Sequence, residues 1–149
     1  MAPIVRIAAL ALVAFALAGC GSSHSAQPPP KGGVTNGGWE VISQGRHAAG
    51  ETVVRVDALA TDPLRLQLRV DASPRASITT TYTVECGQEK AKGGPVPGKT
   101  PLTRELRVPN GGGSQEAHGV FCSVSATATK PAGSATTLTL LERPAPTTQ

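Results

Sequence analysis

The sequence predicts a small all-β domain, built as an antiparallel β-sandwich. Apolar and polar residues alternate with a period of two through three segments, 64–71, 77–86 and 120–127. Such alternation is typical of strands with one buried and one solvated face. Clusters of Gly, Pro, Asn and Asp separate the segments and predict turns between them. No segment after residue 20 shows the period of a helix, so the prediction contains strands alone.

The number of strands suggests how the sheets are arranged. Weaker alternating segments complete a set of seven strands, at 39–43, 52–59, 64–71, 77–86, 102–108, 120–127 and 135–142. Seven short strands in a domain of about 105 residues are typical of an immunoglobulin-like sandwich. A small barrel is the alternative that the pattern leaves open.

The resemblance to immunoglobulin domains is one of architecture only. In those domains a buried Trp lies between the two bridging cysteines, whereas Trp39 precedes both Cys86 and Cys122. They also carry a Tyr two residues before the second Cys, where this sequence has Val120. We therefore expect a sandwich of this general kind and no membership of the immunoglobulin family.

The first 19 residues have the pattern of a signal peptide. One positive charge, Arg6, precedes an 11-residue apolar run, Ile7–Leu17. This run is too short for a transmembrane helix, which needs about 20 residues. The sequence Leu17-Ala18-Gly19-Cys20 then resembles the lipobox of bacterial lipoprotein precursors. The resemblance implies cleavage before Cys20 and attachment of diacylglycerol, with fatty acids such as palmitate, to its thiol; an ordinary buried helix with a stray Cys is the alternative.

The three cysteines agree with this interpretation. If Cys20 carries lipid, Cys86 and Cys122 remain as an even pair, which in an exported domain predicts one disulfide. Both lie on the apolar faces of their predicted strands, so they can pair inside the core. The bridge closes a loop of about 37 residues, which contributes roughly 3–4 kcal/mol in the chain-entropy model. Two separate buried thiols are the alternative.

The chain is expected to have four parts. Residues 1–19 form the signal peptide, and residues 20–38 form the lipidated Cys and a disordered tether rich in Gly, Pro and Ser. The tether has almost no apolar residue to bury and therefore cannot offset the entropy of ordering. Residues 39–143 form the β-sandwich domain, and residues 144–149 form a flexible tail.

Composition excludes some classes of partner. The formal charge is +4, or +3 without Arg6, and the basic residues are scattered. A nucleic-acid-binding domain would show a basic stripe or cluster, so we expect no nucleic-acid partner. After cleavage the aromatic residues are Trp39, Tyr82 and Phe121. So few rings argue against stacking platforms for bases or sugars.

No residue set specifies a reaction, a metal or a cofactor. His24 lies in the tether, His47 in a turn-like stretch, and His118 four residues before Cys122. A copper site would need two His, a Cys and usually a Met, and Met1 is the only Met. The chain has no Gly-x-Ser-x-Gly nucleophile elbow, and its carboxylates are spread out. We expect no catalytic residues, no metal ligands and no enzyme activity.

The segment Gly87–Pro101 is expected to be the longest loop between strands. It carries Lys90, Lys92 and Lys99 among several Gly and Pro residues. A basic loop on a rigid sandwich could contact anionic lipid or an acidic cell-wall polymer. A solvated loop without a partner is the alternative.

These features predict a membrane-anchored extracytoplasmic lipoprotein, with a non-enzymatic binding or accessory domain of the cell envelope. The expected partners are the membrane, through the lipid anchor, and an envelope protein or acidic polymer. An enzyme with an unrecognised site and a purely structural envelope protein are the alternative functions. The sequence specifies neither the ligand nor the oligomeric state.

Overall fold

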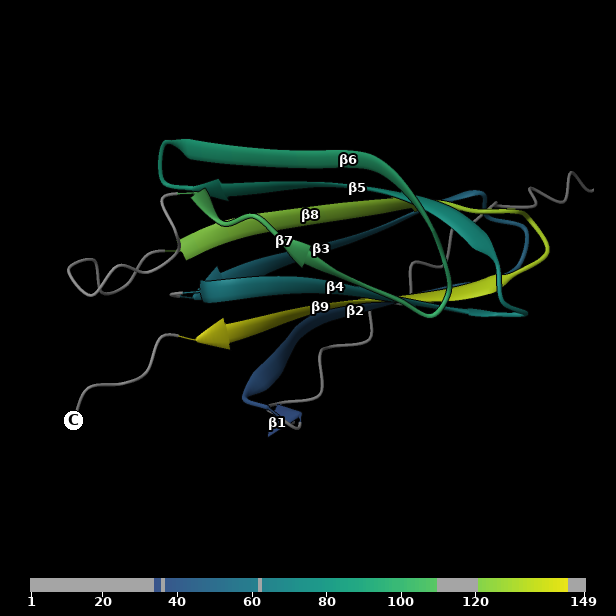
Figure 1. Ribbon diagram of the computed structural model, residues 1–149, viewed down its shortest axis with the longest axis horizontal. Coiled ribbons are helices and arrows are strands. Elements are labelled where there is room, and N and C mark those ends of the chain that lie inside the picture. The colour runs from purple at the N-terminus through teal and green to yellow at the C-terminus, as the bar shows by residue number, and fades with distance from the viewer. Residues whose placement is uncertain (1–33, 36, 62, 110–120, 145–149) are drawn as a thin grey trace, which may run out of the picture.

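The computed structural model describes residues 34–35, 37–61, 63–109 and 121–144, and within these ranges the protein is all-β, as predicted (Figure 1). The described residues form nine strands: β1 (Val34–Thr35), β2 (Trp39–His47), β3 (Val53–Thr61), β4 (Pro63–Ser73), β5 (Ser77–Cys86), β6 (Glu89–Lys99), β7 (Leu102–Leu106), β8 (Phe121–Thr129) and β9 (Ala135–Pro144). In the same ranges, no helix is long and apolar enough to cross a bilayer.

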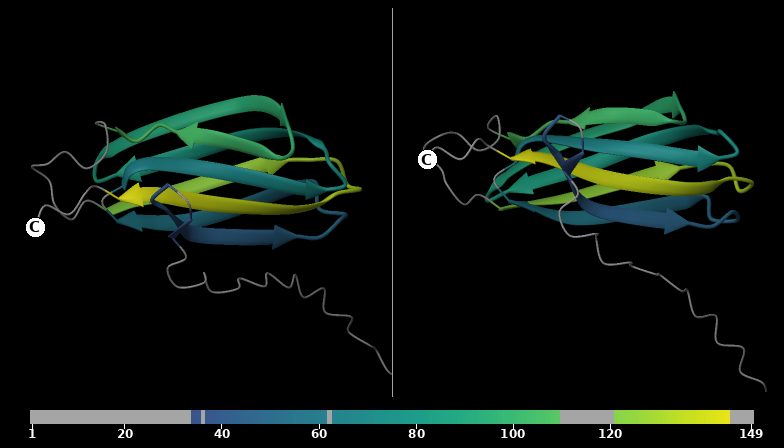
Figure 2. Two further views of the ribbon diagram at one scale, coloured as in Figure 1. Left: turned by 60° about the horizontal axis from the view of Figure 1, so that its bottom comes forward. Right: turned by 90° about the horizontal axis from the view of Figure 1, so that it is seen from below.

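The strands form two antiparallel sheets that face each other across one core (Figure 2). One sheet has the strand order β1-β2-β9-β4-β7, and we call it the leucine sheet because its inward side chains are mostly leucines. The other has the order β3-β8-β5-β6, and we call it the threonine sheet because threonines line its outer face. The two sheets confirm a sandwich-like arrangement over the alternative barrel.

The order of pairing is that of a jelly roll. Apart from the two-residue β1, the first strand pairs with the last (β2 with β9), and the second with the seventh (β3 with β8). The third pairs with the sixth (β4 with β7), and the fourth with the fifth (β5 with β6). Nested antiparallel pairing of eight strands in two sheets defines this topology. The predicted number of seven strands is therefore wrong, and the immunoglobulin-like arrangement, with four strands facing three, is not confirmed.

Strand β6 is the element that the sequence interpretation missed. The segment Gly87–Pro101 was expected to be a loop, but most of it pairs with β5 from Cys86 to Ser77. Gly and Pro residues weaken a strand, but they do not prevent this one from forming. Strand β6 lies at the edge of the threonine sheet and pairs on one side only. Pro is tolerated at sheet edges, where a missing N–H removes no ladder hydrogen bond.

A β-bulge explains the Gly-Gly-Pro sequence in the middle of β6. The register shifts between Thr80 and Tyr82, so Gly94 and Pro95 together lie opposite one residue of β5. Gly94 has φ +101°, which favours glycine, and a Cβ there would lie 2.4 Å from the carbonyl oxygen of Thr80. At Gly93, a Cβ would lie 2.2 Å from Cε1 of Tyr82. Gly93, Gly94 and Pro95 have the composition of a turn, but here they lie within a strand. The two glycines leave room for the inward ring of Tyr82 and for the backbone of β5.

The core lies between the sheets, where alternate residues of each strand point inward. The leucine sheet contributes mainly leucines, and in the ladder Leu68 lies opposite Leu140 while Val70 lies opposite Leu138. The threonine sheet contributes mainly Ala and Val from β3 and β8, with larger side chains from β5. This packing follows directly from the period-two alternation in the sequence.

The predicted disulfide is confirmed, and it lies within one sheet. Cys86 of β5 and Cys122 of β8 occupy directly opposed positions of the ladder, with their Cα atoms 4.2 Å apart. Immunoglobulin domains instead bridge their two sheets. The bond therefore ties neighbouring strands and closes the part of the chain that contains β6 and β7.

Only some of the predicted domain boundaries fall within the described residues. The predicted signal peptide, Cys20 and most of the tether lie outside the described residues. Val34–Thr35, which were expected in the disordered tether, form β1 and pair with the start of β2. At the other end, Pro144 closes β9, and the remainder of the predicted tail lies outside the described residues.

Candidate polar groove on the threonine sheet

The outer face of the threonine sheet carries three directly opposed hydroxyl pairs. Inward residues of β5 and β8 pack in the core, so the residues between them point outward. In the ladder of β5 with β8 the outward pairs are Thr79–Thr129, Thr81–Thr127 and Thr83–Ser125. Each hydroxyl can both donate and accept a hydrogen bond. The face is therefore a regular array of small groups with no fixed preference for donors or acceptors.

Two adjoining hollows make this face a groove, which we call the polar groove. One hollow has a volume of about 460 Å³, and the other has a volume of about 230 Å³. Thr83 and Ser125 line both hollows, so the two adjoin at the middle of the sheet. The larger hollow reaches β3 through Arg55 and Asp57, and the smaller one reaches β6 through Lys92. A bound chain crossing the groove would therefore meet all four strands.

Charged groups of both signs line the polar groove. On the β3 side, Nε of Arg55 donates to both carboxylate oxygens of Asp57 at 2.9 Å. This hydrogen bond, with the charge of Asp57, raises the pKa of Arg55. On the β6 side, Lys90 forms an ion pair with Glu85, its direct neighbour in the ladder. The groove therefore offers a cationic donor and an anionic acceptor on each side of the hydroxyl array.

Apolar side chains lie at one end of the same face. Phe121 begins β8 with 57% of its surface exposed, and Leu59 on β3 is 63% exposed. The ladder places Leu59 opposite Ser123 and Phe121 opposite Thr61, so the two apolar side chains are diagonal neighbours. The few aromatic residues argued against a stacking platform for bases or sugars, and the structure exposes one ring, that of Phe121, beside the groove.

The structure separates the three lysines of the predicted basic loop. Lys90 and Lys92 project from β6 into the two hollows of the polar groove. Lys99 ends the same strand and pairs with Ser77, at the far end of β5. The expected basic loop is therefore an edge strand with two lysines at the groove, and Lys90 is already paired with a carboxylate.

Arg104 supports the groove from behind and was not singled out from the sequence. Its guanidinium points inward from β7, where it donates to the carbonyl and hydroxyl oxygens of Thr80 at 3.0 and 2.9 Å. It also lies 4.9 Å from the ring centroid of Tyr82, whose hydroxyl accepts a hydrogen bond from the backbone of Arg107. The sequence did contain a sign of this position, because an alternation with a period of two places Arg104 on the same face as Leu102 and Leu106.

Of the three histidines, only His47 lies within the described residues, and its position differs from the one expected. His47 was predicted in a solvated turn, but it ends β2 with only 12% of its side chain exposed. Its Nδ1 lies 3.0 Å from Oε2 of Glu51, and its Nε2 lies 3.1 Å from the carbonyl oxygen of Arg55. His24 and His118 lie outside the described residues. Among the residues that are described, no group of three or more His, Cys, Asp or Glu residues could hold a metal ion.

The groove thus combines residues that the sequence suggested with others that only the fold brings together. Lys90 and Lys92 were predicted as binding residues, whereas Asp57, Glu85 and Phe121 join them through the ladder of four strands. Cys20 lies outside the described residues, and Cys86 and Cys122 are structural. In comparisons with known proteins, no protein-family model matches the chain, and no curated protein matches it.

Proposed function

We propose that the protein is a membrane-anchored extracytoplasmic lipoprotein whose sandwich is a non-enzymatic binding domain of the cell envelope. The anchor is supported by the sequence Leu17-Ala18-Gly19-Cys20 behind an apolar run of signal-peptide length. The disulfide supports export, because such bonds persist in oxidising compartments. The polar groove is the observation that carries the binding function.

The chemistry of the groove favours a hydroxyl-rich polymer, such as a glycan strand of the envelope. A sugar ring presents several hydroxyls that each donate and accept, and the array of Thr and Ser can match either role. Asp57 and Glu85 are strong acceptors, while Lys92 supplies a strong donor. Phe121 offers an apolar surface for the C–H face of a sugar ring.

The same chemistry makes an acidic polymer a poorer ligand at this site. Asp57 and Glu85 line the larger hollow together with the cations that pair with them. An anionic chain would approach two carboxylates at close range, and like charges repel. A neutral chain can accept from the cations and donate to the carboxylates at once. We therefore assign the groove to a neutral glycan in preference to an acidic polymer.

The binding test removes hydroxyls from the groove and from a matched control face. The lipidated protein in detergent is mixed with purified cell-wall sacculi, and the bound fraction is measured by sedimentation. T81V/T127V removes one hydroxyl pair of the groove while keeping β-branched side chains. Two lost hydrogen bonds should weaken binding about tenfold. F121A should weaken it further.

The control is T103V/T137V, which removes two hydroxyls from the outer face of the leucine sheet. This variant should bind as the wild type does. Two results would contradict the assignment of the groove. T81V/T127V could bind as strongly as the wild type, or the control could be weakened as much as T81V/T127V. Release of soluble sugar fragments during the incubation would instead support the enzyme alternative.

The anchor is tested separately by Cys20→Ala. We expect the substitution to abolish lipid labelling and to release the protein from the membrane fraction. A variant that stays in that fraction to the same extent as the wild type would contradict the lipoprotein interpretation.

A further inference from the structure

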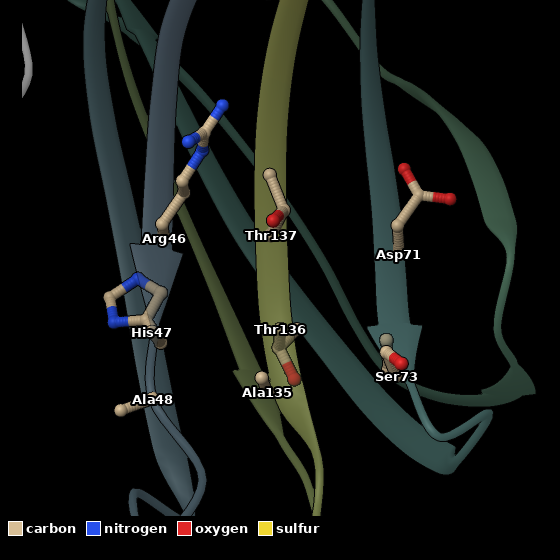
Figure 3. Close-up of a pocket in the computed structure, with 9 residues that line it drawn as sticks. Arg46, His47, Ala48, Asp71, Ser73, Ala135, Thr136 and Thr137 are labelled. Carbon is tan, nitrogen blue, oxygen red and sulfur yellow. The ribbon is translucent and has the colours of Figure 1, made fainter.

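The outer face of the leucine sheet is rich in arginine. Outward positions of β2, β4 and β9 carry Arg46, Arg65, Arg69 and Arg143, together with Asp71 and, on β7, Glu105. Figure 3 shows part of this arginine face, where Arg46, Thr137 and Asp71 lie side by side on β2, β9 and β4. These residues line an open hollow of about 430 Å³.

Most of these arginines have no carboxylate partner within the described residues. Arg65 is the exception, because its Nε and Nη2 donate to the two carboxylate oxygens of Glu105 at 2.7 Å. Arg46, Arg69 and Arg143 form no ion pair in the described part of the chain. Their planar guanidinium groups can donate two parallel hydrogen bonds to a phosphate.

The predicted anchor leads directly into this sheet. The 13 residues 21–33 separate Cys20 from β1, which pairs with the leucine sheet. Even a fully extended connection would keep β1 within about 50 Å of the lipid. Trp39 begins β2, and its ring centroid lies 6.0 Å from the guanidinium carbon of Arg65. Tryptophan is enriched where proteins meet the membrane–water interface.

We propose that the arginine face lies against the anionic phospholipid headgroups of the membrane that holds the anchor. The inference rests on the proposed lipid anchor and adds an orientation to it. The outer faces of the two sheets point in opposite directions (Figure 2). Docking of the arginine face therefore turns the polar groove away from the bilayer, toward the envelope.

The threonine sheet is less suited to an anionic surface. Two of its outward cations, Arg55 and Lys90, are each paired with a carboxylate on the same face. Those carboxylates would be brought against negatively charged headgroups if this face docked. Each face carries four cations and two carboxylates on its strands, but on the arginine face only Arg65 is paired among the described residues. Three guanidinium groups therefore remain to bind phosphate there, against two lysines of the threonine sheet that are unpaired in the described part of the chain, Lys92 and Lys99.

The test places a fluorescent reporter on each face of the lipidated protein. Trp39, the single tryptophan, reports from the arginine face, and the W39F/F121W variant reports from the opposite sheet. Each protein is reconstituted into vesicles of phosphatidylcholine alone or of an equal mixture with phosphatidylglycerol. Energy transfer from the indole to a dansyl-labelled headgroup lipid is measured in both membranes. Phosphatidylglycerol should raise transfer from Trp39 and lower transfer from position 121.

Matched substitutions identify the face responsible. R46A/R69A should reduce the preference for the docked orientation about fivefold for each arginine removed. K90A/K92A removes the same charge from the threonine sheet and should leave the preference unchanged. Thermal melting confirms that both variants are folded. High sodium chloride should abolish the effect of phosphatidylglycerol, because screening weakens the attraction.

Several outcomes would overturn the proposal. Equal transfer in the two membranes would do so, as would loss of the preference in K90A/K92A but not in R46A/R69A. Binding of polyphosphate by the protein in detergent, together with equal transfer in the two membranes, would assign the face to a soluble polyanion. Intact mass of the reconstituted protein shows whether Cys20 carries lipid, so failure of the anchor is distinguished from failure of the orientation.

Discussion

The inward side chains of the leucine sheet are larger than those of β3 and β8 in the threonine sheet. The leucine sheet fills the core with fully buried leucines, which are Leu66, Leu68, Leu138 and Leu140. Strands β3 and β8 of the threonine sheet contribute Ala60, Ala126 and Ala128 at the corresponding depth. Because the free energy of burial rises with apolar area, the leucine sheet gains more from each inward residue. A sandwich can therefore derive its hydrophobic stabilisation unequally from its two layers.

Two links hold β5 of the threonine sheet in place, one to its neighbour β8 and one to β7 of the leucine sheet. The disulfide joins β5 to β8, and Arg104 crosses from β7 to bind Thr80 and Tyr82 of β5. These links hold the strands that form the polar groove. The comparison indicates that covalent and polar contacts replace apolar area where the core residues are small.

The largest expected effect is loss of a leucine from the core. Leu140→Ala should lower the free energy of unfolding by about 2–5 kcal/mol, because it removes buried methyl groups and leaves a cavity beside Leu68. Val56→Ala on β3 removes fewer atoms and should cost about half as much. Urea denaturation of both variants measures the difference. Equal losses would show that the two layers contribute alike.

Removal of the disulfide tests the proposed compensation in the threonine sheet. The C86A/C122A variant should lose about 3–4 kcal/mol of unfolding free energy, since the loop between the cysteines is no longer closed in the unfolded chain. Denaturant titration of the oxidised wild type and the variant gives the value. A loss below about 1 kcal/mol would mean that this sheet does not depend on the bridge.

The interior arginine should contribute less than the disulfide. Arg104→Met keeps an unbranched apolar stem but removes two hydrogen bonds to Thr80 and the contact with the Tyr82 ring. We expect a loss of about 1–3 kcal/mol in the free energy of unfolding. Arg104→Lys should restore only part of it, because an ammonium group lacks the guanidinium fork. Full stability of the Met variant would show that the cation is dispensable.

His47 should matter modestly, because its ring joins β2 of the leucine sheet to the backbone of β3 in the threonine sheet. The sequence predicts that replacing His47 and His118 by Gln changes stability little. The structure places the His47 ring between Glu51 and the backbone of Arg55, so His47→Gln should cost about 1 kcal/mol. Thermal melting of the single variant checks this value. A metal that binds stoichiometrically to the wild type and is lost from the variant would contradict a purely structural role.

The smallest expected effect is the pH dependence of the Arg65–Glu105 pair on the arginine face. The hydrogen bond from Arg65 lowers the pKa of Glu105. The folded pKa therefore lies below the unfolded value of about 4.3. This contribution to stability is present above the unfolded pKa and is lost as the pH falls through the folded pKa. Because both groups are about half exposed, we expect only a slight flattening of the acid limb in Glu105→Gln, measured as melting temperature against pH.

Local alternation was sufficient to predict many of the strands. The predicted segment 77–86 is the same as β5, and 64–71 lies within β4, which extends it by a residue or two at each end. Strand β6 could not be found in this way, because Gly93, Gly94 and Pro95 have the composition of a turn. Their place in a strand depends on the Tyr82 ring and on the edge position of β6.

The polar groove could be predicted only in its parts. The alternation of Thr79, Thr81 and Thr83 is visible in the sequence, and it places their hydroxyls on one outward face. Which residues lie opposite them depends on the register with β8, a strand more than 30 residues away. Asp57 and Lys92 reach the same groove from two further strands. No local pattern carries that information.

Alternation along the chain was enough to predict the strand character of the domain, the inward and outward face of each strong strand and the disulfide between Cys86 and Cys122. These properties are local, because a period of two fixes which side chains share a face, and of the three cysteines Cys86 and Cys122 lie on the apolar faces of strong strands. The nested pairing, the place of β6 and the contrast between the two outer faces became visible only in the folded domain. These depend on contacts between β2 and β9, or β3 and β8, at opposite ends of the domain, where many alternative orders would satisfy the same alternation.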